Sequence, residues 1–117
     1  MTEITERFTG FTMINTFSPP VERAEELKAV LIRATEEFMQ HVDGFVSANF
    51  HVAVDGSNRI VNYVQWTSER HFKAAFGNEA WNRWFDPVNV YAPPDVLPCR
   101  VAYVSNERLG AAGGDAR

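Results

Sequence analysis

Hydrophobic and polar positions alternate with a period of two over residues 11–17, a pattern typical of a strand with one buried face. Pro19 and Pro20 end this pattern, because proline cannot donate a hydrogen bond to a strand ladder. Over residues 21–41 the apolar positions recur every three or four residues, with most charged side chains between them. This spacing predicts a long amphipathic helix, and Gly44 suits the left-handed conformation that often follows one.

Shorter elements are expected in the second half of the chain. Residues 45–54 and 60–66 read as two strands, and the turn-forming residues between them predict a hairpin. A Thr-Ser pair is suited to cap a helix from about residue 69, and a further short helix is expected over residues 79–85. The proline-rich segment 86–98 is interpreted as a loop or lid, and the sequence after it, Cys99 to Ser105, predicts a fourth strand.

The resulting order, strand-helix-strand-strand-helix-strand, predicts an α+β fold of the ferredoxin-like split β-α-β-β-α-β type. Its sheet is antiparallel and carries both helices on one face, so the apolar residues on the other face need a cover. A second copy of the chain supplies that cover most simply, which predicts a sheet-to-sheet homodimer with the shape of an α+β barrel. We expect one domain over residues 9–106, a flexible segment over 1–8 and a disordered tail over 107–117.

Composition narrows the class of function. The net charge is −4 and the basic residues are scattered, which argues against nucleic acid as a partner. The one cysteine, Cys99, allows no internal disulfide, and no apolar run approaches the ~18 residues needed to cross a bilayer, so a cytoplasmic protein without membrane contact is expected. No metal-binding spacing and no glycine-rich phosphate loop is present, so neither a metal nor an organic cofactor is expected. Nine Phe and three Trp indicate an aromatic-lined cavity or an interface.

The candidate chemistry starts from an amide on a strand. Alternation places Asn62 and Trp66 on one face of the third strand, and the same argument groups Asn15 with the apolar side of the first strand and His51 with Phe45 on the second. A buried amide costs free energy unless it has a partner, which is either backbone or a bound ligand. We expect the cavity to lie between the sheet and the helices, with substrate-binding residues Asn15, Phe38, His51, Phe72, Phe76 and Trp81.

The segment GFVSANFHVAVDGSNRIVNYVQWTSERHFKAAF, residues 44–76, resembles the antibiotic biosynthesis monooxygenase family, most specifically in N-Y-x-Q-W-x-S-E. It is most similar to the cofactor-independent anthrone monooxygenases of aromatic polyketide pathways, of the actinorhodin-pathway type. This resemblance implies oxidation of an anthrone-like phenol to a quinone with O2 as co-substrate, and Asn62 and Trp66 as catalytic residues. Phe72 stands where those enzymes carry a tyrosine, and no equivalent of their active-site arginine is identified.

Two alternatives stay open. Haem-degrading oxygenases of the same superfamily use an Asn on the first strand, a Trp on the third and a His on the following helix. Asn15 and Trp66 match the first two, but the histidine position falls near Phe76, and His71 lies more than one turn earlier. The other alternative is a non-catalytic dimer that binds a polyketide or assists its cyclisation. The general base is not identified, because alternation alone places neither His51 nor His71 in the cavity.

Overall fold

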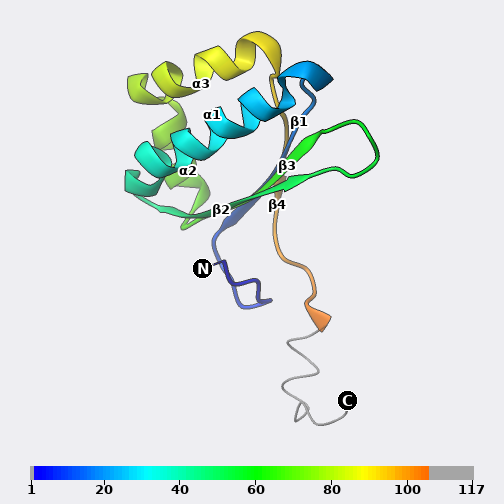
Figure 1. The fold of residues 1–117 in the computed structure, drawn as a ribbon. Coiled ribbons are helices and arrows are strands. Elements are labelled where there is room, and N and C mark those ends of the chain that lie inside the picture. The colour runs from blue at the N-terminus through cyan, green and yellow to red at the C-terminus, as the bar shows by residue number, and fades with distance from the viewer. Residues whose placement is uncertain (1, 106–117) are drawn as a thin grey trace.

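Four strands form one antiparallel sheet in the order β2-β3-β1-β4, and all the helices lie on one face of it (Figure 1). The structure is a computed structural model that describes residues 2–105. The strands are β1 (Phe11–Phe17), β2 (Phe45–Val52), β3 (Ile60–Trp66) and β4 (Asp95–Cys99). The helices are α1 (Ala24–Glu37), α2 (Glu69–Phe76) and α3 (Glu79–Tyr91), and two short 3-10 turns, η1 (Val21–Arg23) and η2 (Met39–His41), flank α1. This arrangement confirms the predicted ferredoxin-like α+β fold.

Helix α1 covers the sheet with the stripe that the sequence spacing predicted. Its buried residues are Ala24, Leu27, Leu31 and Ala34, at intervals of three and four. The regular helix is shorter than expected, because the backbone leaves the helical conformation at Phe38 (φ −128°, ψ −63°). The η2 turn that follows buries Met39 beneath the end of α1.

Strand β2 contains a bulge that the alternation pattern did not reveal. Phe45 lies opposite Trp66 and Ser47 lies opposite Gln65, so Val46 is one residue more than the partner strand has. The extra residue changes the phase of the strand, and Phe45, Ala48 and Phe50 share the helix-covered side. The expectation that His51 shares a face with Phe45 is therefore wrong.

The C-terminal third differs most from expectation. Helix α3 does not end near residue 85 but continues through Pro87 to Tyr91. Its apolar stripe also continues, since Val88 and Ala92 are each only 1% exposed, and this burial outweighs the hydrogen bond that Pro87 cannot make. The fourth strand is Asp95–Cys99, not residues 99–105, and it runs along β1.

An edge position explains why β4 tolerates Pro98. A proline on an edge strand need not donate to a neighbouring strand, so the proline-rich sequence that suggested a loop is compatible with pairing. The lid or loop interpretation of residues 86–98 thus holds only for the short connection between α3 and β4. Residues 107–117, expected to be disordered, lie outside the described residues.

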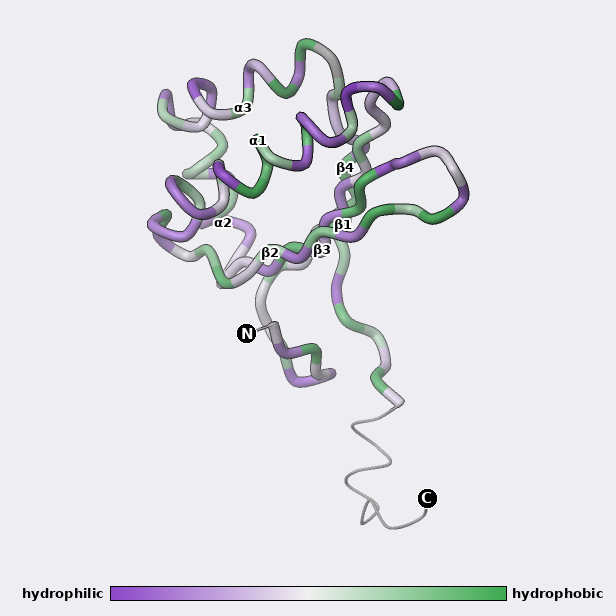
Figure 2. The backbone as a smooth tube through the Cα atoms, in the orientation of Figure 1, coloured by the Kyte–Doolittle hydropathy of each residue, from purple (hydrophilic) through white to green (hydrophobic). Residues whose placement is uncertain are grey.

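The face of the sheet away from the helices has a mixed character. Figure 2 shows hydrophobic and hydrophilic residues interleaved along the strands, whose alternate side chains point to opposite faces of the sheet. The N-terminal segment contacts this face at one end, where the buried Gln65 Nε2 donates to the backbone carbonyl of Glu3 (2.9 Å). The register also places Ile14, Tyr63 and Leu97 in one row across this face. Among the described residues, no helix has the length and apolar character to span a membrane.

Candidate active site

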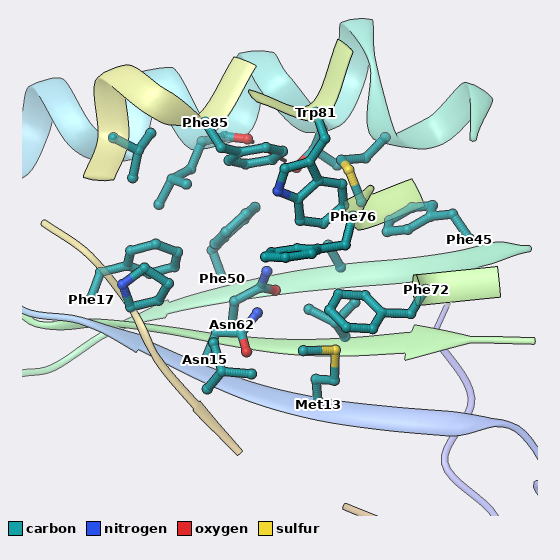
Figure 3. Close-up of a pocket in the computed structure, with 18 of the residues that line it drawn as sticks. Met13, Asn15, Phe17, Phe45, Phe50, Asn62, Phe72, Phe76, Trp81 and Phe85 are labelled. Atoms are coloured by element: carbon teal, nitrogen blue, oxygen red, sulfur yellow. Dashed lines mark hydrogen bonds between the residues drawn. The ribbon is translucent and has the colours of Figure 1, made fainter. Parts of the chain in front are cut away.

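A cavity of about 490 Å³ lies between the sheet and the helices (Figure 3). The strands form its floor, and one row of cross-strand neighbours runs through it: Phe50, Asn62, Asn15 and Val96, one from each strand. Helices α1 and α3 close it from above with residues such as Leu31 and Phe85. Its size is in the range of sites that bury a small organic ligand.

Aromatic rings fill one end of the cavity. Trp66 is 1% exposed, and its ring centroid lies 5.6 Å from that of Phe45 and 5.7 Å from that of Phe72, both edge to face. Trp81 on α3 extends the cluster to Phe85, with centroids 4.8 Å apart. No hydrogen bond joins the indole N–H of Trp66 to any described residue. Flat aromatic ligands pack well against surfaces of this kind.

The two polar atoms of the Asn62 carboxamide have different surroundings. The side chain is buried, at 8% exposure, and its Oδ1 accepts a hydrogen bond from the backbone N–H of Asn49 on β2 (3.0 Å). Its Nδ2 makes no hydrogen bond with any described residue. Because Asn62 lines the cavity, this NH2 group is available to a ligand. The structure thus contains the backbone partner that the sequence allowed and leaves the ligand role open as well.

Asn15 lies directly opposite Asn62 in the β1–β3 register. Figure 3 shows both side chains rising from the sheet into the cavity. The Oδ1 of Asn15 is buried and has no hydrogen-bond partner among the described residues. An unsatisfied buried acceptor costs about 1 to 3 kcal/mol, a cost that a donor on a bound ligand can remove. Together the two amides bring an NH2 group without a described partner and a buried, unsatisfied acceptor to an otherwise apolar floor.

The structure places most, but not all, of the predicted site residues around this cavity. Asn15, Asn62, Trp66, Phe72, Phe76 and Trp81 line it. Phe38 does not line it and instead packs behind Trp81, with ring centroids 6.5 Å apart. His51 is exposed and lies on the opposite face of the sheet, because the bulge at Val46 shifts the phase of β2.

Several lining residues were not among the predicted site residues. Phe45, Phe50 and Phe17 come from the strands, and Phe85, Asn89 and Val96 come from α3 and β4. Trp81, Phe85 and Asn89 follow each other at four-residue intervals, so a helix extended through Pro87 would have placed them on one face. The alternation that grouped His51 with Phe45 would have put Phe50 on the wrong face, because the bulge was not foreseen.

Charged groups stay away from the cavity. Among the residues whose side chains are described, none with an ionisable group lines it. His71 instead binds its helix cap: its Nδ1 lies 2.6 Å from Ser68 Oγ, and its Nε2 lies 3.7 Å from Asp43. The carboxyl of Asp55 has its pKa lowered to about 2 by hydrogen bonds from Ser57, but it is fully exposed on the β2–β3 turn. Within residues 2–105, His, Cys, Asp and Glu form no group of three or more that could hold a metal ion.

Comparison with known proteins gives one family and several relatives. Residues 10–87 match the sequence model of the family described as "Antibiotic biosynthesis monooxygenase". Tetracenomycin-F1 monooxygenase of Streptomyces glaucescens is 37% identical over 93 residues, which cover 80% of this chain and 82% of that protein.

Solved structures agree on the fold. SnoaB of Streptomyces nogalater, described as a cofactor-independent oxygenase, superposes with a TM-score of 0.73 at 20% identity, covering 81% of this chain and 95% of SnoaB. The ActVA-Orf6 monooxygenase of Streptomyces coelicolor, in complex with nanaomycin D, superposes with a TM-score of 0.70 at 24% identity, covering 81% and 89% of the two chains.

Proposed function

Because the chain belongs to the antibiotic biosynthesis monooxygenase family, and is therefore a monooxygenase, we propose that it oxidises an anthrone-like or other electron-rich phenolic polyketide to a quinone with O2. Neither a metal nor an organic cofactor takes part. The amide pair of Asn62 and Asn15 carries this proposal, because it sets one donor and one acceptor in a cavity otherwise suited to flat rings. A phenolic ketone presents the complementary pair, a carbonyl oxygen and a hydroxyl.

The polar groups fit the charge that develops during such a reaction. Loss of a benzylic proton from an anthrone makes an enolate, whose oxygen accepts hydrogen bonds more strongly than the ketone does. Asn62 Nδ2–H and the indole N–H of Trp66 donate to that oxygen. Asn15 accepts from a neighbouring phenol once its side chain turns the buried Oδ1 toward the cavity. Fixed donors in an apolar cavity stabilise such an anion better than mobile water does.

The oxidation then needs only O2. The enolate passes one electron to O2, and the resulting superoxide and carbon radical combine to form a peroxide on the benzylic carbon. Loss of the second benzylic proton breaks the O–O bond, so one oxygen atom stays as the new carbonyl and the other leaves as water. Anthrone and O2 thus give quinone and water. The first proton goes to solvent, because the described lining side chains include no base.

Phe72 has no hydrogen-bonding group and so limits which side chains can donate to the substrate. It stacks on Phe11 with ring centroids 5.8 Å apart and contacts Trp66 edge to face, so it holds the aromatic end together without contributing a donor. The donor role therefore falls on Asn62 and Trp66. The haem alternative has no comparable support, since no histidine lines the cavity among the described residues.

The homodimer belongs to the same proposal. The row of Ile14, Tyr63 and Leu97 offers apolar surface on the sheet face that the helices leave uncovered, and Leu97 is 58% exposed. Two such faces, related by a twofold axis, bury each other. We place the protein in the cytoplasm, where a free thiol such as Cys99 stays reduced.

Oxygen uptake by the purified protein with dithranol, a 1,8-dihydroxyanthrone, tests the activity. We expect a rate well above that of buffer, formation of 1,8-dihydroxyanthraquinone, and no change when a metal chelator is added. A rate equal to that of buffer with dithranol and with a panel of tricyclic and tetracyclic phenols contradicts the proposal. Tight binding of those phenols without oxygen uptake would favour the non-catalytic alternative.

A further inference from the structure

The orientation of the Asn62 carboxamide decides what the cavity offers. Rotating the amide by half a turn exchanges its oxygen and nitrogen and places an acceptor where the donor stood. Such an acceptor would repel an enolate oxygen instead of stabilising it. The contact that fixes Oδ1 therefore matters as much as Asn62 itself, and that contact is the backbone N–H of Asn49 (3.0 Å).

Asn49 also makes a second contact with the same stretch of β3. Its side-chain Nδ2 donates to the backbone carbonyl of Tyr63 (3.1 Å), the residue directly opposite it in the β2–β3 register and next to Asn62 in sequence. In an antiparallel pair, the carbonyl of the opposite residue is the nearest competing acceptor for the backbone N–H of Asn49. The side chain of Asn49 donates to this carbonyl and competes with the backbone N–H for it, while the backbone N–H donates to Asn62 Oδ1.

We propose that Asn49 is a positioning residue for Asn62, a role that rests on the proposed oxygenase function. Its side chain holds the Tyr63 carbonyl, its backbone N–H holds Asn62 Oδ1, and the Asn62 NH2 group is thereby turned to the substrate oxygen. Asn49 does not line the main cavity and belongs to the other face of the sheet, so it touches no reacting atom.

The chemistry at residue 49 restricts what can replace it. Aspartate has the same shape but cannot donate to a carbonyl, and its charge repels the Tyr63 oxygen. Alanine leaves the carbonyl free to take the Asn49 backbone N–H away from Asn62. Both substitutions therefore release the Asn62 amide while leaving its chemical identity intact. Ser47→Ala is the matched control, because Ser47 Oγ makes a neighbouring β2–β3 side-chain contact, with Gln65 Oε1 (3.4 Å), that does not involve Asn62.

Steady-state kinetics with dithranol test the proposal in the full chain. We expect N49A and N49D to lower kcat about three- to tenfold, the effect of one hydrogen bond, while KM changes less than twofold. In the N62A background, N49A should cause no further loss, and S47A should behave as wild type. A wild-type rate for N49A and N49D overturns the proposal. An equal fold-loss from N49A with and without Asn62 does so too, because it indicates a merely structural role.

Binding separates failure of this inference from failure of the proposed function. Quenching of tryptophan fluorescence by 1,8-dihydroxyanthraquinone, a stable quinone, measures binding. N49D should bind this quinone more weakly than wild type does, whereas N49D/N62A should bind it as strongly as N62A does. If wild type neither oxidises dithranol nor binds the quinone, the proposed function fails. A crystal structure of N49D then decides the positioning role: an Asn62 Oδ1 still bound to the backbone N–H of residue 49 overturns it. N49D also replaces N49A in every comparison if N49A does not fold.

Discussion

The Asn62 side chain lines the cavity, its Oδ1 accepts a hydrogen bond from β2, and its Nδ2 is the donor that the proposed reaction uses. Its replacement by alanine removes the proposed donor to the developing enolate, and loss of one such donor typically costs about 10²-fold or more in kcat. We therefore expect N62A to lower kcat for dithranol about 100-fold and to raise KM much less. The measurement is oxygen uptake under steady-state conditions.

Asn82→Ala is the control for that substitution, since Asn82 is an exposed amide on α3 that does not line the cavity. N62A also leaves the buried N–H of Asn49 without its partner, so a thermal melt must accompany the kinetics. A folded N62A enzyme with undiminished kcat would remove Asn62 from the mechanism.

Phe72 allows a second test at the residue scale. A tyrosine at this position adds one hydroxyl to a partly buried ring that lines the cavity and contacts Trp66. If that hydroxyl donates to the substrate, the gain is about one hydrogen bond, which is a three- to tenfold rise in kcat/KM. We expect Phe72→Tyr to raise kcat/KM for dithranol within this range while the melting temperature changes little. A large loss of activity would show that the rings leave no space for a hydroxyl.

The sequence allowed Asn62, Trp66 and Asn15 to be grouped because alternation along a strand depends only on the chain itself. The hydrogen bond that orients Asn62 could not be foreseen in the same way. Its donor is the backbone of Asn49, thirteen residues earlier, and the contact depends on the register between two strands. Partners of buried amides are set by neighbouring elements, so sequence identifies the amide but not its orientation.

At the scale of elements, contacts between neighbouring elements likewise explain why the bulge in β2 and the full length of α3 were not predicted. The bulge at Val46 carries no sequence signal, yet it moves Phe50 into the cavity and His51 out of it. Pro87 gave a signal that was misread: it disfavours a helix locally, but the burial of Val88 and Ala92 against the core sustains α3. Local propensity was correct for β1 and β3, whose bounds match the prediction, because no tertiary contact opposed it.

Gly44 links the elements around η2, β2 and α2. Its φ is +85°, and a Cβ there would collide with the Cβ and the imidazole of His71. Gly56 has a similar φ of +90°, but its Cβ would meet no atom within 4 Å. We expect Gly56→Ala to cost about 1 kcal/mol from backbone conformation alone, and Gly44→Ala to cost clearly more. Denaturant unfolding measures both.

The double variant Gly44→Ala/His71→Gly isolates the collision, because alanine at position 71 would keep the Cβ that takes part in it. Removal of the whole His71 side chain should bring the cost of the Gly44 substitution, measured against His71→Gly alone, down toward that of Gly56→Ala. Equal costs for the two glycines in the wild-type background would show that the contact with His71 is unimportant.

The β2–β3 turn carries a pH-dependent contact. Asp55 accepts hydrogen bonds from the backbone N–H of Ser57 (3.0 Å) and its hydroxyl (2.6 Å) and pairs with Arg59, which lowers the Asp55 pKa from 3.8 to about 2. The folded state thus prefers the ionised form. The stabilisation is complete above about pH 4 and is lost as the pH falls toward 2.

Asp55→Asn should therefore melt below wild type at pH 7, and the difference should narrow between pH 4 and pH 2. Thermal melts across this range measure it. Asp86→Asn is the matched control, because Asp86 is an exposed carboxylate that makes no hydrogen bond or ion pair with the described residues. A gap that stays constant down to pH 2 would mean that ionisation of Asp55 does not contribute.

At the scale of the whole molecule, the cavity lies on one side of the sheet, while the other side carries the proposed dimer contact. The two functions should therefore be separable. Leu97→Glu sets a charge at the β4 end of the apolar row and should shift the protein from dimer to monomer in light scattering at micromolar concentration. Val90→Glu, on a residue of α3 that is 83% exposed, should leave the dimer intact.

The Leu97→Glu monomer should keep a kcat for dithranol within about threefold of wild type, because its floor of Asn15, Asn62 and Trp66 is unchanged. Its melting temperature should fall, since Ile14 and Tyr63 in the apolar row then face water instead of the second copy. A wild type that is monomeric at all concentrations contradicts the dimer without touching the site. A folded monomer that has lost its activity has the opposite meaning: the cavity depends on the second copy, and the sheet face belongs to the catalytic unit.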